Sequence, residues 1–292
     1  MPEANFSLLD LRDLSKPACK LIDAVSGAVG ILYEPTRIRR RAKAEADATL
    51  IAAKAGVTVD DIQLRAKARV KNKERRRQQN IESVVSQAVT FLPESVSAER
   101  VDDDWVFQFF EHSQDVSDEQ MKSLWARLLA GEVAKPGSYS LRTLNVVKHL
   151  HSEDADLFSK VCKYLWSSGP DKPKLLLFIG HSALGKSDNP TSELNLGALK
   201  HLESIGLVHA NVNIGLEEPR QLFYFGKGYS FKLIEKKRII DLTGLVGIGD
   251  AALTDVGMEL APLTGAEPDS SYRDAVIEGY RRQQELLIEE IA

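Results

Sequence analysis

The chain has 292 residues, of which 43% are hydrophobic and 27% charged, a balance typical of a folded, soluble protein. Its longest apolar stretch, residues 24–33, is about half of a membrane span, so we expect no transmembrane segment. The N-terminus lacks the pattern of a secretory signal, and the two cysteines, Cys19 and Cys162, provide no disulfide framework. We therefore expect a cytoplasmic protein with reduced thiols.

The formal net charge of -4 conceals an uneven distribution of charge. Residues 36–77 hold fourteen Lys or Arg against five Asp or Glu, while the rest of the chain is acidic. A basic arm on an acidic body suggests an anionic partner or the acidic face of another subunit. The residues proposed to bind such a partner are Arg37, Arg39, Arg40, Arg41, Lys71, Lys73, Arg75, Arg76 and Arg77.

Four interpretations of these basic clusters stay open. They can form a solvated helical face, or contact nucleic acid, an anionic membrane surface or an acidic protein surface. Aromatic residues are not interleaved with the cations, so stacking on bases is not implied, although contact with a phosphate backbone is possible.

The N-terminal third predicts helices. Residues 5–33 suit short helices, residues 37–55 are rich in good helix formers, and residues 61–92 suit one long helix that ends before Pro93. The middle of that long helix, residues 70–80, is almost without apolar side chains. A helix that is polar all round cannot lie on a core, so this part must project into water or meet another chain.

Residues 116–131 contain the best-specified helix, VSDEQMKSLWARLLAG. We expect Ser117 as its N-cap, with Gln120 completing a capping box, and Gly131 at its C-terminal end. A helical stripe of large apolar residues runs along it: Met121, Leu124, Trp125, Leu128 and Leu129.

We expect Trp125 to be buried against Trp105 and Phe109 of the preceding helix, residues 102–112. Two further helices follow, one from residue 140 and one capped by Ser152 that carries apolar residues as far as 166. Consecutive helices with short links predict a compact helical bundle.

The composition changes after residue 170. Residues 196–206 predict a helix, residues 207–214 and 221–235 predict strands, residues 253–260 a short helix and residues 272–291 a terminal helix. This order resembles a winged-helix domain, an analogy that carries no activity with it. The expected fold is therefore mainly α: a helical basic arm (1–92), a helical bundle (93–170) and a small winged-helix-like α/β module (171–292).

One segment matches a P-loop letter for letter. GHSALGKS places Gly180, Gly185, Lys186 and Ser187 at the positions that would hold a nucleotide phosphate. A P-loop requires a helix to begin at the Gly-Lys-Ser, yet Pro190 follows within the first turn. A surface loop is therefore favoured, and we expect no cofactor.

Catalytic and metal-binding patterns are weak. His149, His151 and Glu153 alternate near a helix end, where ligands on one face would need a spacing of four residues. Neither cysteine has a neighbour that would activate it as a nucleophile. We expect no metal and no catalytic residue, and thus a protein that is not an enzyme.

Several blocks resemble an uncharacterised bacterial family of unknown function that is related in pattern to the Abi-alpha abortive-infection proteins. They are residues 33–46, 75–84, 115–133 and 199–208 and the LTDVGMEL segment, with WARLLAGE as the most distinctive part. The resemblance implies a role in phage defence and supplies no catalytic residue.

The leading hypothesis is a non-enzymatic interaction or scaffold protein that forms a homo-oligomer through its N-terminal arm. A further protein partner is possible. The alternatives are a nucleic-acid-binding protein that uses the basic arm or the winged-helix-like module, and a P-loop nucleotide-binding protein.

Overall fold

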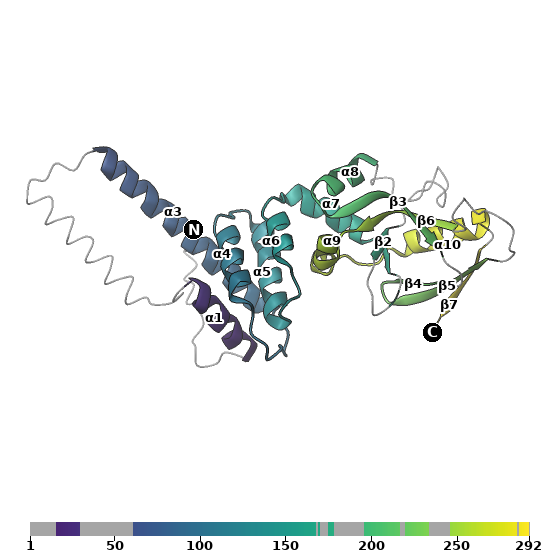
Figure 1. Ribbon diagram of the computed structural model, residues 1–292, viewed down its shortest axis with the longest axis horizontal. Coiled ribbons are helices and arrows are strands. Elements are labelled where there is room, and N and C mark those ends of the chain that lie inside the picture. The colour runs from purple at the N-terminus through teal and green to yellow at the C-terminus, as the bar shows by residue number, and fades with distance from the viewer. Residues whose placement is uncertain are drawn as a thin grey trace, which may run out of the picture. The chain divides into compact units, whose positions relative to one another are not determined.

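The computed structural model describes residues 16–29, 61–167, 169, 175–177, 196–216, 220–233, 246–284 and 286–291 (Figure 1). These residues are mainly helical and include one antiparallel sheet. Two compact units divide the chain, Met1–Leu144 and Asn145–Ala292. The three-part division drawn from the sequence stays a prediction. Helices from its first two parts pack together in the first unit.

The first unit is helical. It contains α1 (Lys16–Val29), α3 (Asp61–Phe91), α4 (Asp103–Ser113) and α5 (Glu119–Ala134), and α6 (Leu141–Val147) leads into the second unit. Helix α3 packs against α4 and α5, and α1 packs against the same two helices. The bounds of α3 confirm the long helix expected over residues 61–92.

Aromatic side chains form the centre of this unit. Trp125 of α5 is fully buried, and its ring meets Phe109 edge-on with 5.2 Å between centroids. Phe109 in turn stacks on Trp105 at 5.3 Å. The expected burial of Trp125 is confirmed: its ring contacts Phe109, and Trp105 stacks on that same Phe109 ring.

Both ends of the best-specified helix differ from the sequence prediction. Asp118, one residue after Ser117, is the N-cap, and its carboxylate accepts a hydrogen bond from the Met121 amide at 2.9 Å. The predicted N-cap at Ser117 is therefore wrong by one residue. Gly131 lies inside the helix, which continues to Ala134.

Gly131 has a packing role. A Cβ atom built on Gly131 would lie 2.6 Å from the Tyr139 hydroxyl, so only glycine lets this ring lie against the helix. The next residue, Glu132, is buried and accepts hydrogen bonds from the amides of Gly137 and Tyr139. Together, Gly131 and Glu132 hold the loop after α5 against the helix.

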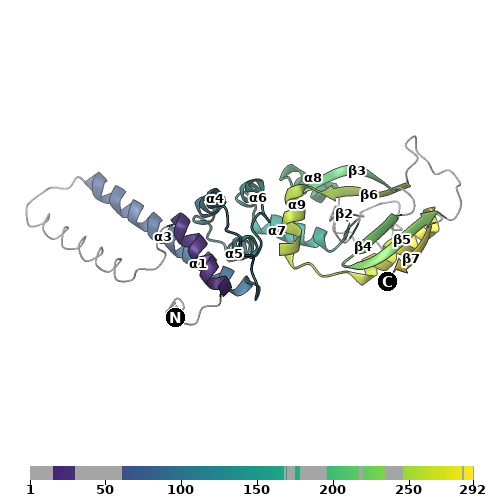
Figure 2. The same ribbon diagram turned by 60° about the horizontal axis from the view of Figure 1, so that its bottom comes forward.

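The second unit combines helices with a seven-stranded sheet in the described part of the chain (Figures 1 and 2). Its helices are α7 (Ser152–Cys162), α8 (Leu196–Ser204), α9 (Asp255–Leu260), the 3-10 helix η1 (Ala261–Thr264) and α10 (Ser270–Gln284). Its strands are β1 (Leu165–Ser167), β2 (Leu175–Leu177), β3 (Val208–Leu216), β4 (Arg220–Tyr224), β5 (Lys227–Leu233), β6 (Val246–Leu253) and β7 (Leu286–Ile291).

The sheet order is β3-β6-β2-β1-β4-β5-β7, and every pairing is antiparallel. A core of aromatic and aliphatic residues packs between the β4–β5 half of this sheet and α10: Trp166, Leu222, Tyr224, Tyr229, Phe231, Tyr272, Val276, Tyr280 and Ile288. The sheet is thus larger than the small hairpin that we expected.

Two predicted helices were too long. The helix assigned through residue 166 ends at Cys162, and Leu165–Ser167 instead pairs with β2 and β4. The terminal helix ends at Gln284, and Leu286–Ile291 pairs with β5 along the sheet edge. The predicted cap of α7 was also wrong, because His151 rather than Ser152 is the N-cap and its amide donates to Asp154 at 2.9 Å.

Candidate interaction surface

The first half of α3 is exposed on all sides. Residues 62–76 are fifteen consecutive exposed residues, whereas Ile81, Val84, Val85 and Ala88 are buried in the first unit. Fifteen helical residues span about 22 Å. Both views show the early turns of α3 extending beyond α1, α4 and α5 (Figures 1 and 2). We call residues 62–76 the basic segment.

The basic segment has seven cationic side chains and one acidic side chain, Glu74. The cations are Arg65, Lys67, Arg69, Lys71, Lys73, Arg75 and Arg76. Because a helix turns by about 100° per residue, Arg69 and Lys73 lie on one side, and Lys67 and Lys71 lie on the other. The segment can therefore meet an anionic surface from either side.

Large apolar side chains accompany these charges. Ile62, Leu64 and Val70 are 65%, 50% and 56% exposed, respectively. A solvated helical face needs no such residues, and a contact surface benefits from them because surface ion pairs alone contribute little. The segment therefore combines cationic and apolar side chains on its exposed surface.

Arg77, the last predicted anion-binding residue, already has a partner within the chain. Its guanidinium donates two hydrogen bonds to the Asp115 carboxylate, at 2.9 Å and 2.7 Å. This pairing lowers the pKa of Asp115 below its ordinary value. Arg76 lies 3.8 Å from the same carboxylate and stays more exposed. Arg77 thus anchors α3 to the link between α4 and α5.

Helix α4 presents an acidic face to solvent. Asp104, Phe107, Gln108 and Glu111 are exposed at helical spacing, and Phe107 is 53% exposed. The opposite side of α4 is buried through four residues: Trp105, Val106, Phe109 and Phe110. We call the four exposed residues the acidic face of α4.

Sequence reasoning did not identify the acidic face. The available signal was Phe107, which falls outside the period of the buried α4 residues and so had no place in the core. Phe107 therefore adds exposed apolar area to a face that is otherwise polar.

The other predicted site residues give little further support. Arg37, Arg39, Arg40, Arg41, Gly180, Gly185, Lys186 and Ser187 lie outside the described residues. Within the described ranges there is no group of three or more His, Cys, Asp or Glu able to hold a metal. In those same ranges, the helices are all too short or too polar to cross a membrane.

A comparison with protein families gives one match. The model of the family described as protein of unknown function (DUF2806) matches residues 64–277. The chain belongs to this family. The match shows no relation to the Abi-alpha proteins. No curated protein and no solved structure matches the chain.

The range shared with DUF2806 contains both surfaces described above. It begins at Leu64 within the basic segment and includes the whole acidic face of α4. The cluster at residues 37–41 precedes the match. A function common to DUF2806 proteins is therefore better sought in α3 and α4 than in that earlier cluster.

Proposed function

We propose that this protein is a non-enzymatic, oligomeric interaction protein of the cytoplasm, in which the basic segment of one copy docks on the acidic face of α4 in another. The observation that carries the proposal is the run of fifteen exposed helical residues with seven cations. No core of described residues lies beneath this part of α3, and a helix that is polar all round projects into water or meets another chain.

The two surfaces match in charge and spacing. Arg69 and Arg76 are seven residues apart on α3, and Asp104 and Glu111 are seven residues apart on α4. Seven residues return to nearly the same side of a helix after two turns. Two helices packed side by side can therefore align both cations with both carboxylates.

Apolar contact would supply the larger part of the binding energy. Val70 lies among the cations of α3, and Phe107 lies among the acidic residues of α4. Exposed ion pairs contribute only about 0–1 kcal/mol each, whereas a buried Phe ring contributes several times more. In a symmetric dimer each copy provides both surfaces, so the contact would be made twice.

Light scattering and mass photometry on the full-length protein test this proposal. We expect more than one chain per particle at tens of micromolar. Reversing the two aligned cations, in Arg69→Glu with Arg76→Glu, should weaken assembly about tenfold or more, since each 1.4 kcal/mol changes the dissociation constant tenfold. The matched control is Lys67→Glu with Lys71→Glu, which changes the charge equally on the other side of α3 and should leave assembly intact.

Nucleic-acid binding is the second candidate, favoured by the presence of cations on both sides of α3. In that case both reversal pairs would weaken binding of single-stranded DNA equally, and binding would fall steeply with salt. A full-length protein that stays monomeric at tens of micromolar, and binds DNA in this manner, would replace the first proposal with the second.

The sheet order supports a winged-helix-like arrangement within the second unit. The strands β3, β6 and β2 are neighbours in that order, and α8 directly precedes β3. The basic side chains of α8 are engaged, however: Lys200 pairs with Glu203, and His201 contacts Asp154 at 2.6 Å. Nucleic-acid binding therefore rests on α3 rather than on α8.

Two broader hypotheses remain proposals. A role in phage defence rests on the resemblance in pattern to Abi-alpha proteins alone. Nucleotide binding at Gly180, Gly185, Lys186 and Ser187 rests on the sequence match alone. Pro190 disfavours it, because it lies within the first turn of the helix that a P-loop requires.

A further inference from the structure

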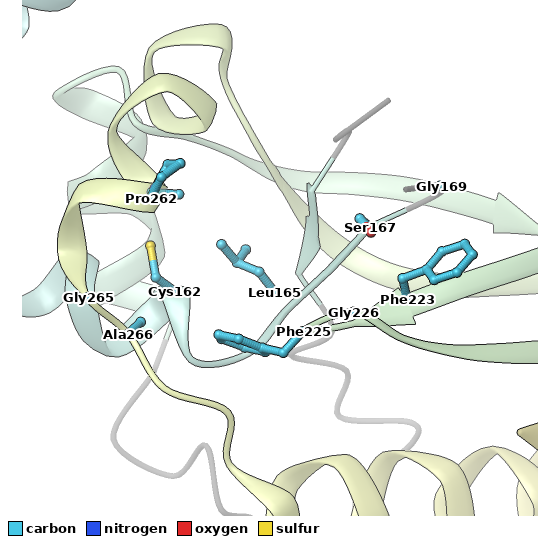
Figure 3. A pocket seen from close by; sticks show the side chains of 11 residues that line it. Cys162, Leu165, Ser167, Gly169, Phe223, Phe225, Gly226, Pro262, Gly265 and Ala266 are labelled. Carbon is cyan, nitrogen blue, oxygen red and sulfur yellow. The ribbon is translucent and has the colours of Figure 1, made fainter. Parts of the chain in front are cut away.

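A cavity lies within the second unit. It has a volume of about 460 Å³ and is bordered by the end of α7, by β1, by η1 and by the turn between β4 and β5. Figure 3 shows Cys162, Leu165, Pro262 and Phe225 around a common space. A volume of several hundred cubic ångströms is typical of sites for small molecules.

The described residues that line this cavity are all uncharged. The hydroxyl of Ser167 and the thiol of Cys162 are the polar side-chain groups among them. Burial raises the pKa of Cys162 to about 12, so its thiol stays neutral and does not act as a nucleophile. A charged ligand would find no counterion among the lining residues, whereas an apolar ligand would lose no hydrogen bonds on entering.

Phe225 has an unusual backbone at the rim of the cavity. Tyr224 and Lys227 are paired, and the two residues between them have positive φ angles, 46° at Phe225 and 83° at Gly226. Such a turn prefers Asn or Gly at its first central position, and a bulky residue there is strained. Among the described residues other than glycine, Phe225 is the one with positive φ.

The strain has a visible consequence, because it brings an aromatic ring to the cavity. The Phe225 side chain is 43% exposed, and its ring touches Tyr224 edge-on with 5.0 Å between centroids. Burial in the core therefore does not explain why a phenylalanine is held in this position. Strained residues of this kind cluster at ligand sites.

We propose that this cavity binds an uncharged, mainly apolar small molecule that carries a ring. The ring of the ligand packs against Phe225 and Leu165, and at most one polar group reaches the Ser167 hydroxyl. This site does not depend on the assembly through α3, since all of its lining residues belong to the second unit.

Nile red, an uncharged dye that fluoresces in apolar surroundings, tests the proposal on the full-length protein. We expect saturable binding of one dye per chain. Phe225→Asn creates the favoured Asn-Gly turn, so it should keep or raise the Tm while weakening dye binding at least tenfold. Phe91→Asn is the matched control, because it removes another exposed ring, 40% exposed, and should leave dye binding unchanged.

A second variant keeps the test independent of the turn. Ala266→Trp adds bulk to the cavity wall and leaves Phe225 and Gly226 intact, so it should also abolish binding. Three outcomes would overturn the proposal: wild-type protein without saturable binding, Phe225→Asn with wild-type affinity, or Ala266→Trp with wild-type affinity.

Discussion

At the residue scale, Trp125 is the central core residue of α5, the helix that the sequence specifies best. Its side chain is fully buried, with Phe109 against one edge. Trp125→Ala should lower the free energy of unfolding by about 3–5 kcal/mol, since it removes a large ring and leaves a cavity. Urea unfolding followed by circular dichroism measures this loss. Leu141→Ala, at a position 45% exposed in the same unit, is the control and should change stability by about 0.5 kcal/mol or less.

A Trp125→Ala protein of unchanged stability that no longer assembled would contradict this assignment. It would show Trp125 to be a contact residue and not a core residue.

Single residues also show where sequence reasoning stops. The apolar period places Trp125 in the core, but the cap of α5 required a choice between Ser117 and Asp118, which both favour that position. The role of Gly131 depends on Tyr139, eight residues away and outside the helix. The partner of Arg77 is Asp115, 38 residues distant. Neither contact leaves a periodic pattern in the sequence.

At the scale of elements, the ion pair between Arg77 and Asp115 anchors α3 to the link between α4 and α5. Because the folded-state pKa of Asp115 is lowered, its contribution to stability is present above the ordinary carboxyl value of about 3.9. The contribution is lost as the pH falls through the lower folded value. Asp115→Asn should therefore have a lower Tm than wild type at pH 7, and the difference should shrink towards pH 3.

Thermal unfolding of both proteins across that pH range measures the effect. Asp103→Asn is the matched control, because its carboxylate is 85% exposed and lies 3.6 Å from Arg100. Its Tm should stay close to that of wild type throughout. A difference between Asp115→Asn and wild type that did not change with pH would contradict the role given to this pair.

The elements themselves were predictable where the apolar period is long. Helices α3, α4 and α5 follow from it to within a few residues. Strands β1 and β7 were assigned to helices, because short apolar runs such as Leu165–Ser167 and Leu286–Ile291 suit both structures. Only their pairing with distant strands determines that these two segments are strands. Strand β6, VGIGDAAL, was missed because glycine and aspartate are poor strand formers.

At the scale of the whole molecule, both units carry candidate binding features: two surfaces in the first unit and one cavity in the second. The first unit presents the basic segment and the acidic face of α4, and the second contains the apolar cavity. The sequence predicted the basic segment from charge and polarity alone. Nothing in it indicated the cavity, whose described lining residues come from three separate stretches of chain and meet only in the folded unit.

The central claim is that α3 of one copy docks on α4 of another, and a mixing experiment tests it most directly. One variant is Arg69→Glu with Arg76→Glu, and the other is Asp104→Lys with Glu111→Lys. Each should be largely monomeric alone, since each places like charges opposite one another. Mixed in equal amounts, the reversed α3 of the first faces the reversed α4 of the second, and the two unaltered surfaces also match. Mass photometry should therefore show assemblies in the mixture and monomers in each separate sample. A mixture that stays monomeric, or single variants that assemble as well as wild type, would contradict the proposed docking.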